Sequence, residues 1–172
     1  MHAVFSRPER GEYAGYYERY VSLVPAGDLI STLAAQPVAG LLSGLSEERA
    51  EYRYAAGKWS VKEALGHMID TERVMAYRAL RFGRNDATEL AGYEQDPYVE
   101  NGGFGAQALA DLIEEFRAVR AATICLLRGL PMEAWRRGGL ADGKAVTVRA
   151  LAWIIAGHEL YHERIYRDRC GL

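Results

Sequence analysis

The sequence contains few cysteines and few histidines: two and four, respectively, in 172 residues. Cys125 and Cys170 form no CxxC pair, so we expect neither a disulfide framework nor a cysteine-rich metal site. Cys125 is expected to be buried within a helix, and Cys170 to be exposed near the C-terminus. Positive charge is not in excess either, because 21 lysines and arginines stand against 23 acidic residues, which gives a net charge of −2. Phosphate binding needs concentrated positive charge, so nucleic acid is not expected as the main partner.

Long hydrophobic runs are also missing. No apolar stretch reaches the ~20 residues of a membrane span, and residues 1–10 are polar and lack the apolar region of a signal peptide. We therefore expect a cytoplasmic protein without a membrane segment. Hydrophobic residues make up 49% and charged residues 26% of the chain. This composition is typical of soluble proteins, and residues 1–172 are enough for a single domain with one core.

Strand patterns are scarce, and apolar residues recur mostly at the 3.6-residue period of a helix. The periodicity predicts four substantial helical segments, of which the first is interrupted by prolines: 12–45, 60–84, 106–128 and 147–169. Within the first segment, residues 12–24 are expected as one helix that Pro25 ends, and residues 138–143 are expected as a turn-rich connection. Ser60 and Glu63 have the spacing of a capping box at the start of the second segment, and Pro37 is expected to break the first. Each segment has one apolar stripe, so we predict an all-α fold, a four-helix bundle.

Two of the four histidines lie within the segment GHELYH, at Gly157–His162. His158 and His162 are four residues apart, so they project from one face of the predicted last helix. They fall on the apolar seam that contains Leu151 and Ile155, which predicts that both rings face inward. A buried polar group without a partner costs roughly 1–3 kcal/mol, and one divalent cation would satisfy both imidazoles. Two hydrogen-bonded core histidines are the alternative.

His67 is the third candidate ligand, on the second helical segment. It lies just outside the apolar stripe, which places it near the rim of the bundle. Gly66 and Gly157 each precede a candidate ligand, and glycine within a helix costs about 1 kcal/mol relative to alanine, so we expect close approach of another segment there. Three protein nitrogens with an open position are the pattern of a catalytic metal site, so His67, His158 and His162 are predicted to hold one ion.

The segment HELYH also matches HExxH, in which a glutamate acts as the base of a zinc protease. The extended form of this motif needs a glycine and a third histidine, where this chain has Ile165 and Asp168. No predicted sheet precedes the motif to hold a peptide. A zincin-type protease is therefore a remote alternative.

Acidic residues near the histidines are weak candidates for a catalytic base: Asp70, three residues after His67, and Glu159, which follows His158. Asp70 could instead orient an imidazole, and both could be surface or ion-paired acids. Arg120 lies near the inward stripe of its helix, and we expect its stem to pack while its head reaches water. Residues 85–105 read as a loop rich in acids, which would disfavour anionic ligands if the loop covers the metal.

Three stretches of the sequence carry a family resemblance: KWSVKEALGHMIDTE at Lys58–Glu72, GYEQDPYV at Gly92–Val99, and VRALAWIIAGHELYH at Val148–His162. With the spacing of the helices, they make the chain similar to the DinB-like superfamily, in particular its YfiT-like branch. The resemblance implies an up-down-down-up four-helix bundle, often a homodimer. It also implies a divalent metal, commonly nickel or zinc, held by residues that match His67, His158 and His162.

The resemblance leaves the reaction open. Relatives include transferases and isomerases that use low-molecular-weight thiols such as bacillithiol or mycothiol, and others are labelled metal-dependent hydrolases. We therefore expect a small-molecule substrate, with either a thiol or water activated at the metal. A non-catalytic metal-binding or sensor bundle is the third hypothesis, because the fold alone does not decide function.

Overall fold

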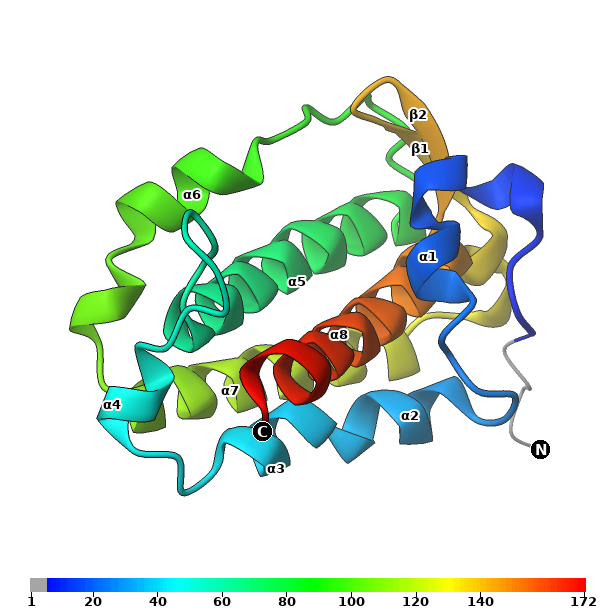
Figure 1. Ribbon diagram of the computed structural model, residues 1–172. Helices are drawn as coiled ribbons and strands as arrows, with labels where there is room; N and C mark the ends of the chain where they lie inside the picture. Colours follow the sequence, from blue (N-terminus) through cyan, green and yellow to red (C-terminus); the bar gives the residue numbers. More distant parts are fainter. Residues whose placement is uncertain (1–5) are drawn as a thin grey trace.

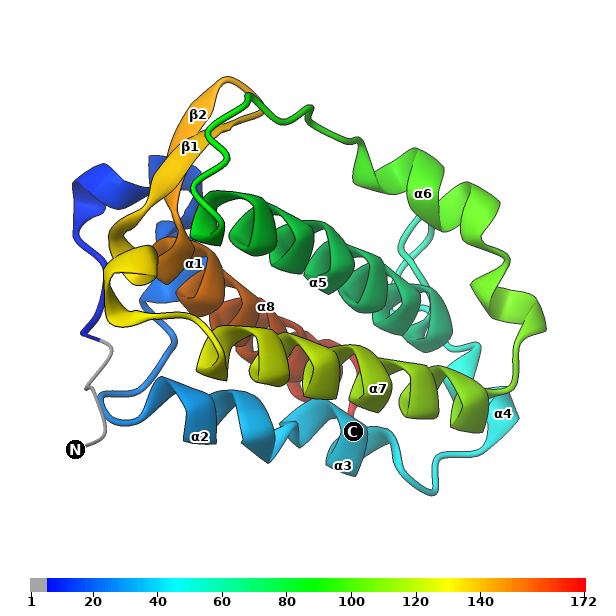
Figure 2. The same ribbon diagram turned by 180° about the vertical axis from the view of Figure 1, so that it is seen from behind.

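The computed structural model describes residues 6–172, so His2 lies outside the described residues. Its main helices form the predicted four-helix bundle, as Figures 1 and 2 show from opposite sides. One rod of the bundle consists of two short helices, and the other three rods are single long helices: α2 (Leu29–Ala35) with α3 (Pro37–Leu42), α5 (Val61–Gly83), α7 (Leu109–Arg128) and α8 (Val148–Cys170).

The smaller elements connect and flank these rods. They are η1 (Arg10–Glu12), η2 (Gly15–Tyr17), α1 (Glu18–Val21), α4 (Glu47–Ala50), α6 (Gln95–Gly102), η3 (Phe104–Ala106), η4 (Met132–Arg136), β1 (Gly138–Ala141) and β2 (Lys144–Thr147). The helix α1 packs against α8. None of the described helices combines the length and the apolar character needed to cross a membrane.

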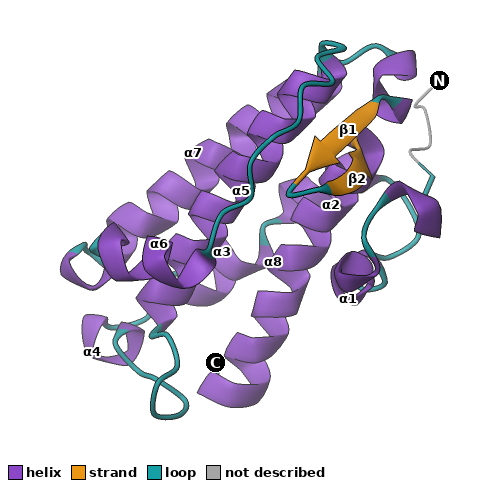
Figure 3. Ribbon diagram, turned by 90° about the horizontal axis from the view of Figure 1, so that it is seen from above, coloured by secondary structure: helices purple, strands orange, loops and turns teal. Residues whose placement is uncertain are grey.

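The rods follow an up-down-down-up order. In Figure 1 the α2–α3 rod and α8 run in one direction, whereas α5 and α7 run in the other. Because α5 and α7 are consecutive but parallel, the chain between them must return along the full length of the bundle. Residues 84–108, the return segment, span this length, and Figure 3 shows the segment passing over α5. The sequence predicted only a loop here; α6 and η3 correct that prediction.

The helix boundaries follow local chemistry. The Ser60 hydroxyl accepts a hydrogen bond from the Glu63 amide at 3.2 Å, and the Glu63 carboxylate accepts one from the Ser60 amide at 2.7 Å. This confirms the predicted capping box at the start of α5. Pro37 is the first residue of α3 and follows Gln36, whose φ of +44° is in the left-handed region. The predicted break in the first rod is therefore confirmed.

Other expectations are corrected near the chain's surface. Residues 138–143, expected as a turn-rich connection, belong to an antiparallel hairpin in which Gly138 pairs with Thr147. The first run, expected as one helix over 12–24, contains only η2 and the short α1. Cys125, expected to be buried, is exposed, whereas Cys170, expected to be exposed, is buried. The cysteine predictions failed because the apolar stripe of a helix does not show which of its flanks a neighbouring element covers.

The core consists of two buried apolar clusters. One includes Leu33, Met75 and Ile155 and lies toward the hairpin, whereas the other includes Leu65 and Tyr166. Among the buried charged side chains, three lie at corresponding heights of the rods and interrupt the core: Glu72 on α5, Arg120 on α7 and Glu159 on α8. The candidate ligands lie beside this polar layer, because His158 directly precedes Glu159.

Candidate metal centre

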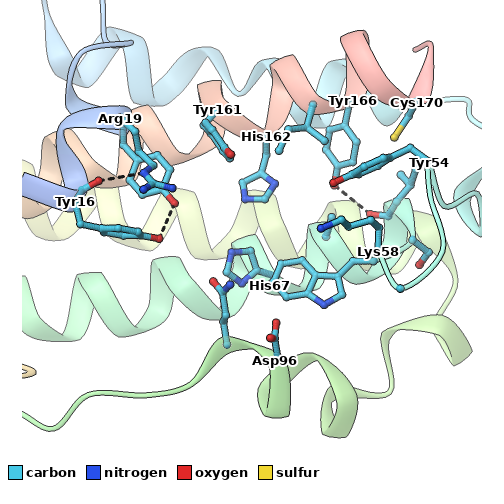
Figure 4. Close-up of a pocket in the computed structure, with 18 residues that line it drawn as sticks. Tyr16, Arg19, Tyr54, Lys58, His67, Asp96, Tyr161, His162, Tyr166 and Cys170 are labelled. Atoms are coloured by element: carbon cyan, nitrogen blue, oxygen red, sulfur yellow. Dashed lines mark hydrogen bonds between the residues drawn. The ribbon is translucent and has the colours of Figure 1, made fainter.

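The three predicted ligands come together between α5 and α8. His67 comes from the second turn of α5, and His158 and His162 come from one face of α8. The Nε2 atom of His158 lies 3.1 Å from Nε2 of His67 and 3.1 Å from Nε2 of His162. One ring nitrogen from each of the three residues falls within 4.8 Å of the others. The expected convergence is therefore present, and Figure 4 shows His67 and His162 facing each other.

These separations fit one bound cation. Zinc–nitrogen bonds of ~2.0–2.1 Å in a tetrahedral site place neighbouring nitrogens ~3.3 Å apart. Protons alone cannot satisfy the same arrangement. A neutral imidazole nitrogen carries either one hydrogen or one lone pair, so Nε2 of His158 can complete only one of its two 3.1 Å contacts as a hydrogen bond. The donor set thus suits a divalent ion better than a hydrogen-bonded network.

Burial keeps the three rings ready to bind a metal. His67 is 5% exposed, and His158 and His162 are each 6% exposed. Burial lowers the pKa of His67 from 6.5 to about 4 and the pKa of His162 to about 3. The pKa of His158 lies well below 6.5, first through burial and then through the neighbouring imidazoles and Arg120. Neutral imidazole is the form that ligates metals, so no proton has to leave at neutral pH.

Neighbouring side chains orient the ligands. The Thr71 hydroxyl lies 3.4 Å from Nδ1 of His67 and 2.9 Å from the hydroxyl of Tyr93. Such an outer contact fixes which ring nitrogen faces the metal. The ring of Trp59 lies against His67 with the centroids 4.6 Å apart, and Tyr20 meets His158 edge-on at 5.1 Å.

The two glycines beside the ligands permit close packing, as expected. A Cβ atom on Gly157 would lie 2.0 Å from the backbone oxygen of Tyr20, so only glycine lets α1 approach α8 here. A Cβ on Gly66 would lie 2.3 Å from the ring of Phe104. Gly66 therefore admits a side chain from the return segment, whereas Gly157 admits a backbone.

Two adjoining cavities contact the histidines. The Lys58 cavity, of about 370 Å³, is walled by His67, His162, Trp59 and Lys58 among others. The Tyr93 cavity, of about 260 Å³, is walled by His67, His158, Met75 and Tyr93 among others. The two cavities adjoin, because they share five lining residues: Tyr16, Tyr20, His67, Gln95 and Asp96. His67 thus contacts both cavities, as expected of a ligand near the rim, although its ring is buried.

The two acids singled out in the sequence do not line these cavities. Asp70 points to Arg73, with 3.6 Å between the charged atoms, and burial raises its pKa despite that partner. Glu159 is 2% exposed and accepts a hydrogen bond of 2.6 Å from Arg120. Arg120 itself is 1% exposed, so the expectation that its head reaches water is wrong. Its guanidinium also holds Glu72 at 2.8 Å.

Asp96 on α6 lines both cavities, and Figure 4 shows it beside His67. The sequence had placed this residue only within an acidic loop. Its carboxylate raises the pKa of His67, although burial outweighs it. The position of Asp96 depends on the path of the return segment between the parallel helices α5 and α7. The sequence did not predict it, because a stripe of apolar residues does not show the direction of a helix.

Comparisons with known proteins agree with the fold. No curated protein sequence matches the chain. Among solved structures, YfiT from Bacillus subtilis, described as a probable metal-dependent hydrolase with an unusual four-helix bundle topology, superimposes with a TM-score of 0.66. The match covers 95% of this chain and 93% of YfiT at 14% sequence identity, so it establishes a shared fold. The model of the DinB superfamily matches residues 32–165. The chain therefore belongs to the DinB superfamily.

Proposed function

We propose that the chain is a divalent-metal-dependent enzyme that activates a low-molecular-weight thiol for transfer to an electrophile, with His67, His158 and His162 holding nickel or zinc. The observation that carries this proposal is the convergence of three Nε2 atoms where two cavities meet. When bound with an open position, such an ion acts as a Lewis acid that lowers the pKa of a thiol or of water.

The surroundings favour a reaction between two substrates. The Lys58 and Tyr93 cavities adjoin at His67 and have volumes of about 370 and 260 Å³; the first also contacts His162 and the second His158. A thiol and its acceptor could therefore meet without sharing one space. In such a transfer the thiol loses its proton to solvent, a sulfur–carbon bond forms, and the bond from carbon to its leaving group breaks.

The positions of Glu159 and Asp70 support a thiol over water. A free thiol has a pKa of ~8.5, far below that of water, so it needs less help from a base. Glu159 is held by Arg120, and Asp70 does not line either cavity. Neither acid is placed to remove a proton from a molecule at the histidines.

Hydrolysis is the second candidate function, and one specific observation favours it. Asp96 lines both cavities and is exposed, so its carboxylate is available to accept a proton from water. The likeness to YfiT, which is described as a probable metal-dependent hydrolase, agrees with this candidate. Replacing Asp96 with Asn separates the two functions, because ester hydrolysis should fall while thiol transfer is largely retained.

The experiment that tests the proposal uses protein loaded with zinc or nickel. Bacillithiol and a halogenated acceptor are supplied, and the conjugate is quantified by mass spectrometry; a nitrophenyl ester without thiol tests hydrolysis. His158→Ala and chelator-treated protein are the controls. Metal-dependent conjugation supports the proposal. Conjugation that survives in His158→Ala contradicts it, and metal binding without turnover of thiols or esters would favour a metal-binding or sensor protein.

A further inference from the structure

We infer that the Lys58 cavity binds an organic anion, with the anionic group at the ammonium of Lys58 and the reacting end beside His67 and His162. This inference rests on the proposed function and narrows its substrate class. Both of these histidines and Lys58 line the cavity. Its volume of about 370 Å³ lies within the usual range for a small organic ligand.

Lys58 differs from the other lysines of the chain. Lys62 lies 3.0 Å from a carboxylate oxygen of Glu47 and 2.7 Å from one of Glu51, and Lys144 lies 2.5 Å from Asp142. No carboxylate of residues 6–172 lies within 4 Å of the Lys58 ammonium. Figure 4 shows its side chain extending into the cavity from the loop before α5. An unpaired cation aimed at a cavity is available for a ligand.

A second cation adds to the positive charge of the Lys58 cavity. Arg19 also lines the Lys58 cavity, and Figure 4 places it and Lys58 on either side of His67 and His162. Its guanidinium lies 4.3 Å from the centre of the Tyr16 ring, and its Nε donates to the Tyr16 carbonyl oxygen at 3.2 Å. Among the described lining residues, Asp96 is the one acid that opposes these two cations.

The Tyr93 cavity has the opposite polarity. Glu94 and Asp96 line it, and none of its described lining residues is a lysine or an arginine. Glu94 and Asp96 therefore disfavour anions here, whereas in the Lys58 cavity Asp96 is outweighed by the two cations. An anionic co-substrate is thereby directed to the Lys58 cavity, which leaves the Tyr93 cavity for an uncharged acceptor.

The body of the anion should be apolar or aromatic. Trp59 and Tyr54 line the cavity next to Lys58, and the Trp59 ring already packs on His67. Aromatic walls bind flat or apolar groups by burial and offset stacking. One molecule could thus place a carboxylate at Lys58 and its body against Trp59.

Three ring-matched probes test the inference by isothermal titration of zinc-loaded protein: phenylacetate, benzyl alcohol and benzylamine. We expect phenylacetate to bind at least about fivefold more tightly than the other two, because one well-placed ion pair contributes ~1 kcal/mol. Lys58→Gln should remove this preference and Lys58→Arg should retain it. Lys144→Gln removes the same charge outside the cavity and should change affinity less than about twofold.

Several results would overturn the inference. The first is equal or undetectable binding of phenylacetate and benzyl alcohol, and the second is an equal effect of Lys58→Gln and Lys144→Gln on affinity. The third is a phenylacetate preference that survives in Lys58→Gln, which would indicate that the carboxylate binds to zinc alone. The probes carry neither a thiol nor a scissile bond, so the readout is independent of turnover. Lys58-dependent binding without any thiol transfer would contradict the proposed function and leave the inference standing.

Discussion

The guanidinium of Arg120 donates a 2.6 Å hydrogen bond to the carboxylate of Glu159, the residue that follows His158. Arg120 also binds Glu72 and the backbone oxygen of Leu33, and the second carboxylate oxygen of Glu159 accepts from the Val38 amide. These bonds connect all four rods of the bundle at the height of the histidines. The network therefore fixes the part of α8 that carries His158.

Replacing Arg120 with Met should destabilise the protein strongly. The change leaves Glu72 and Glu159 buried without their cation, which typically costs ~3–5 kcal/mol of unfolding free energy. Urea denaturation measures the difference. Arg117→Met on the same helix is the matched control, because Arg117 is exposed and its side chain donates to the Ser43 hydroxyl; it should change stability by less than ~0.5 kcal/mol. Similar losses for both variants would refute the role of the network.

Gly157→Ala should destabilise the protein by ~1–3 kcal/mol, as overpacked sites do. The added Cβ would lie 2.0 Å from the backbone oxygen of Tyr20, so α1 must move away from α8. Gly40→Ala in α3 is the control, since its Cβ would meet nothing within 4 Å and alanine favours helix. Thermal unfolding should show a lower midpoint for the first variant and an unchanged or higher one for the second. The reverse order would show that α1 is packed differently.

Thr71→Val should weaken zinc binding by about tenfold, because outer-shell partners of metal ligands typically contribute 10–100-fold. The change removes the hydroxyl that lies 3.4 Å from Nδ1 of His67. Competition with a chromophoric chelator gives the affinity. Thr123→Val provides a buried control on α7, where the lost hydroxyl bonds only the Val119 carbonyl oxygen at 3.0 Å. Unchanged affinity in Thr71→Val would mean that packing alone orients His67.

The metal-free protein should lose stability as the pH falls below 6.5. Folding lowers the pKa of His67 to about 4 and of His162 to about 3, so between these values and 6.5 the unfolded chain binds more protons than the folded chain. The free energy of unfolding then decreases by up to ~1.4 kcal/mol per pH unit for each histidine, and above 6.5 they add no slope. Urea titrations of metal-stripped protein test this dependence. His67→Gln should have a shallower slope; an identical slope would show that His67 is protonated when folded.

Much of the site was predictable because its ligands follow helical periodicity. His158 and His162 share one face of α8 by their spacing alone, and Gly66 and Gly157 marked the close approach of other segments. The capping box at Ser60 fixed the start of α5, and with it the position of His67. Local rules of this kind act within a few residues, so a single sequence contains them.

The surroundings of the ligands were not predictable in the same way. Arg120 was expected to reach water because its helix stripe gives no sign that Glu72 and Glu159 lie opposite it. Asp96 lies at the site because the return segment passes it on the way between two parallel helices. Both depend on contacts between rods far apart in the chain, which periodicity within one helix does not encode.

X-ray absorption spectroscopy of the zinc- or nickel-loaded protein is the decisive experiment on the three-histidine centre, because it reports the donor atoms around the ion. We predict three imidazole nitrogens at ~2.0–2.1 Å and an oxygen donor that completes the shell. His158→Ala should reduce the imidazole count. A shell containing sulfur at ~2.3 Å, as Cys170 in the Lys58 cavity would give, or an imidazole count unchanged in His158→Ala, would contradict this prediction.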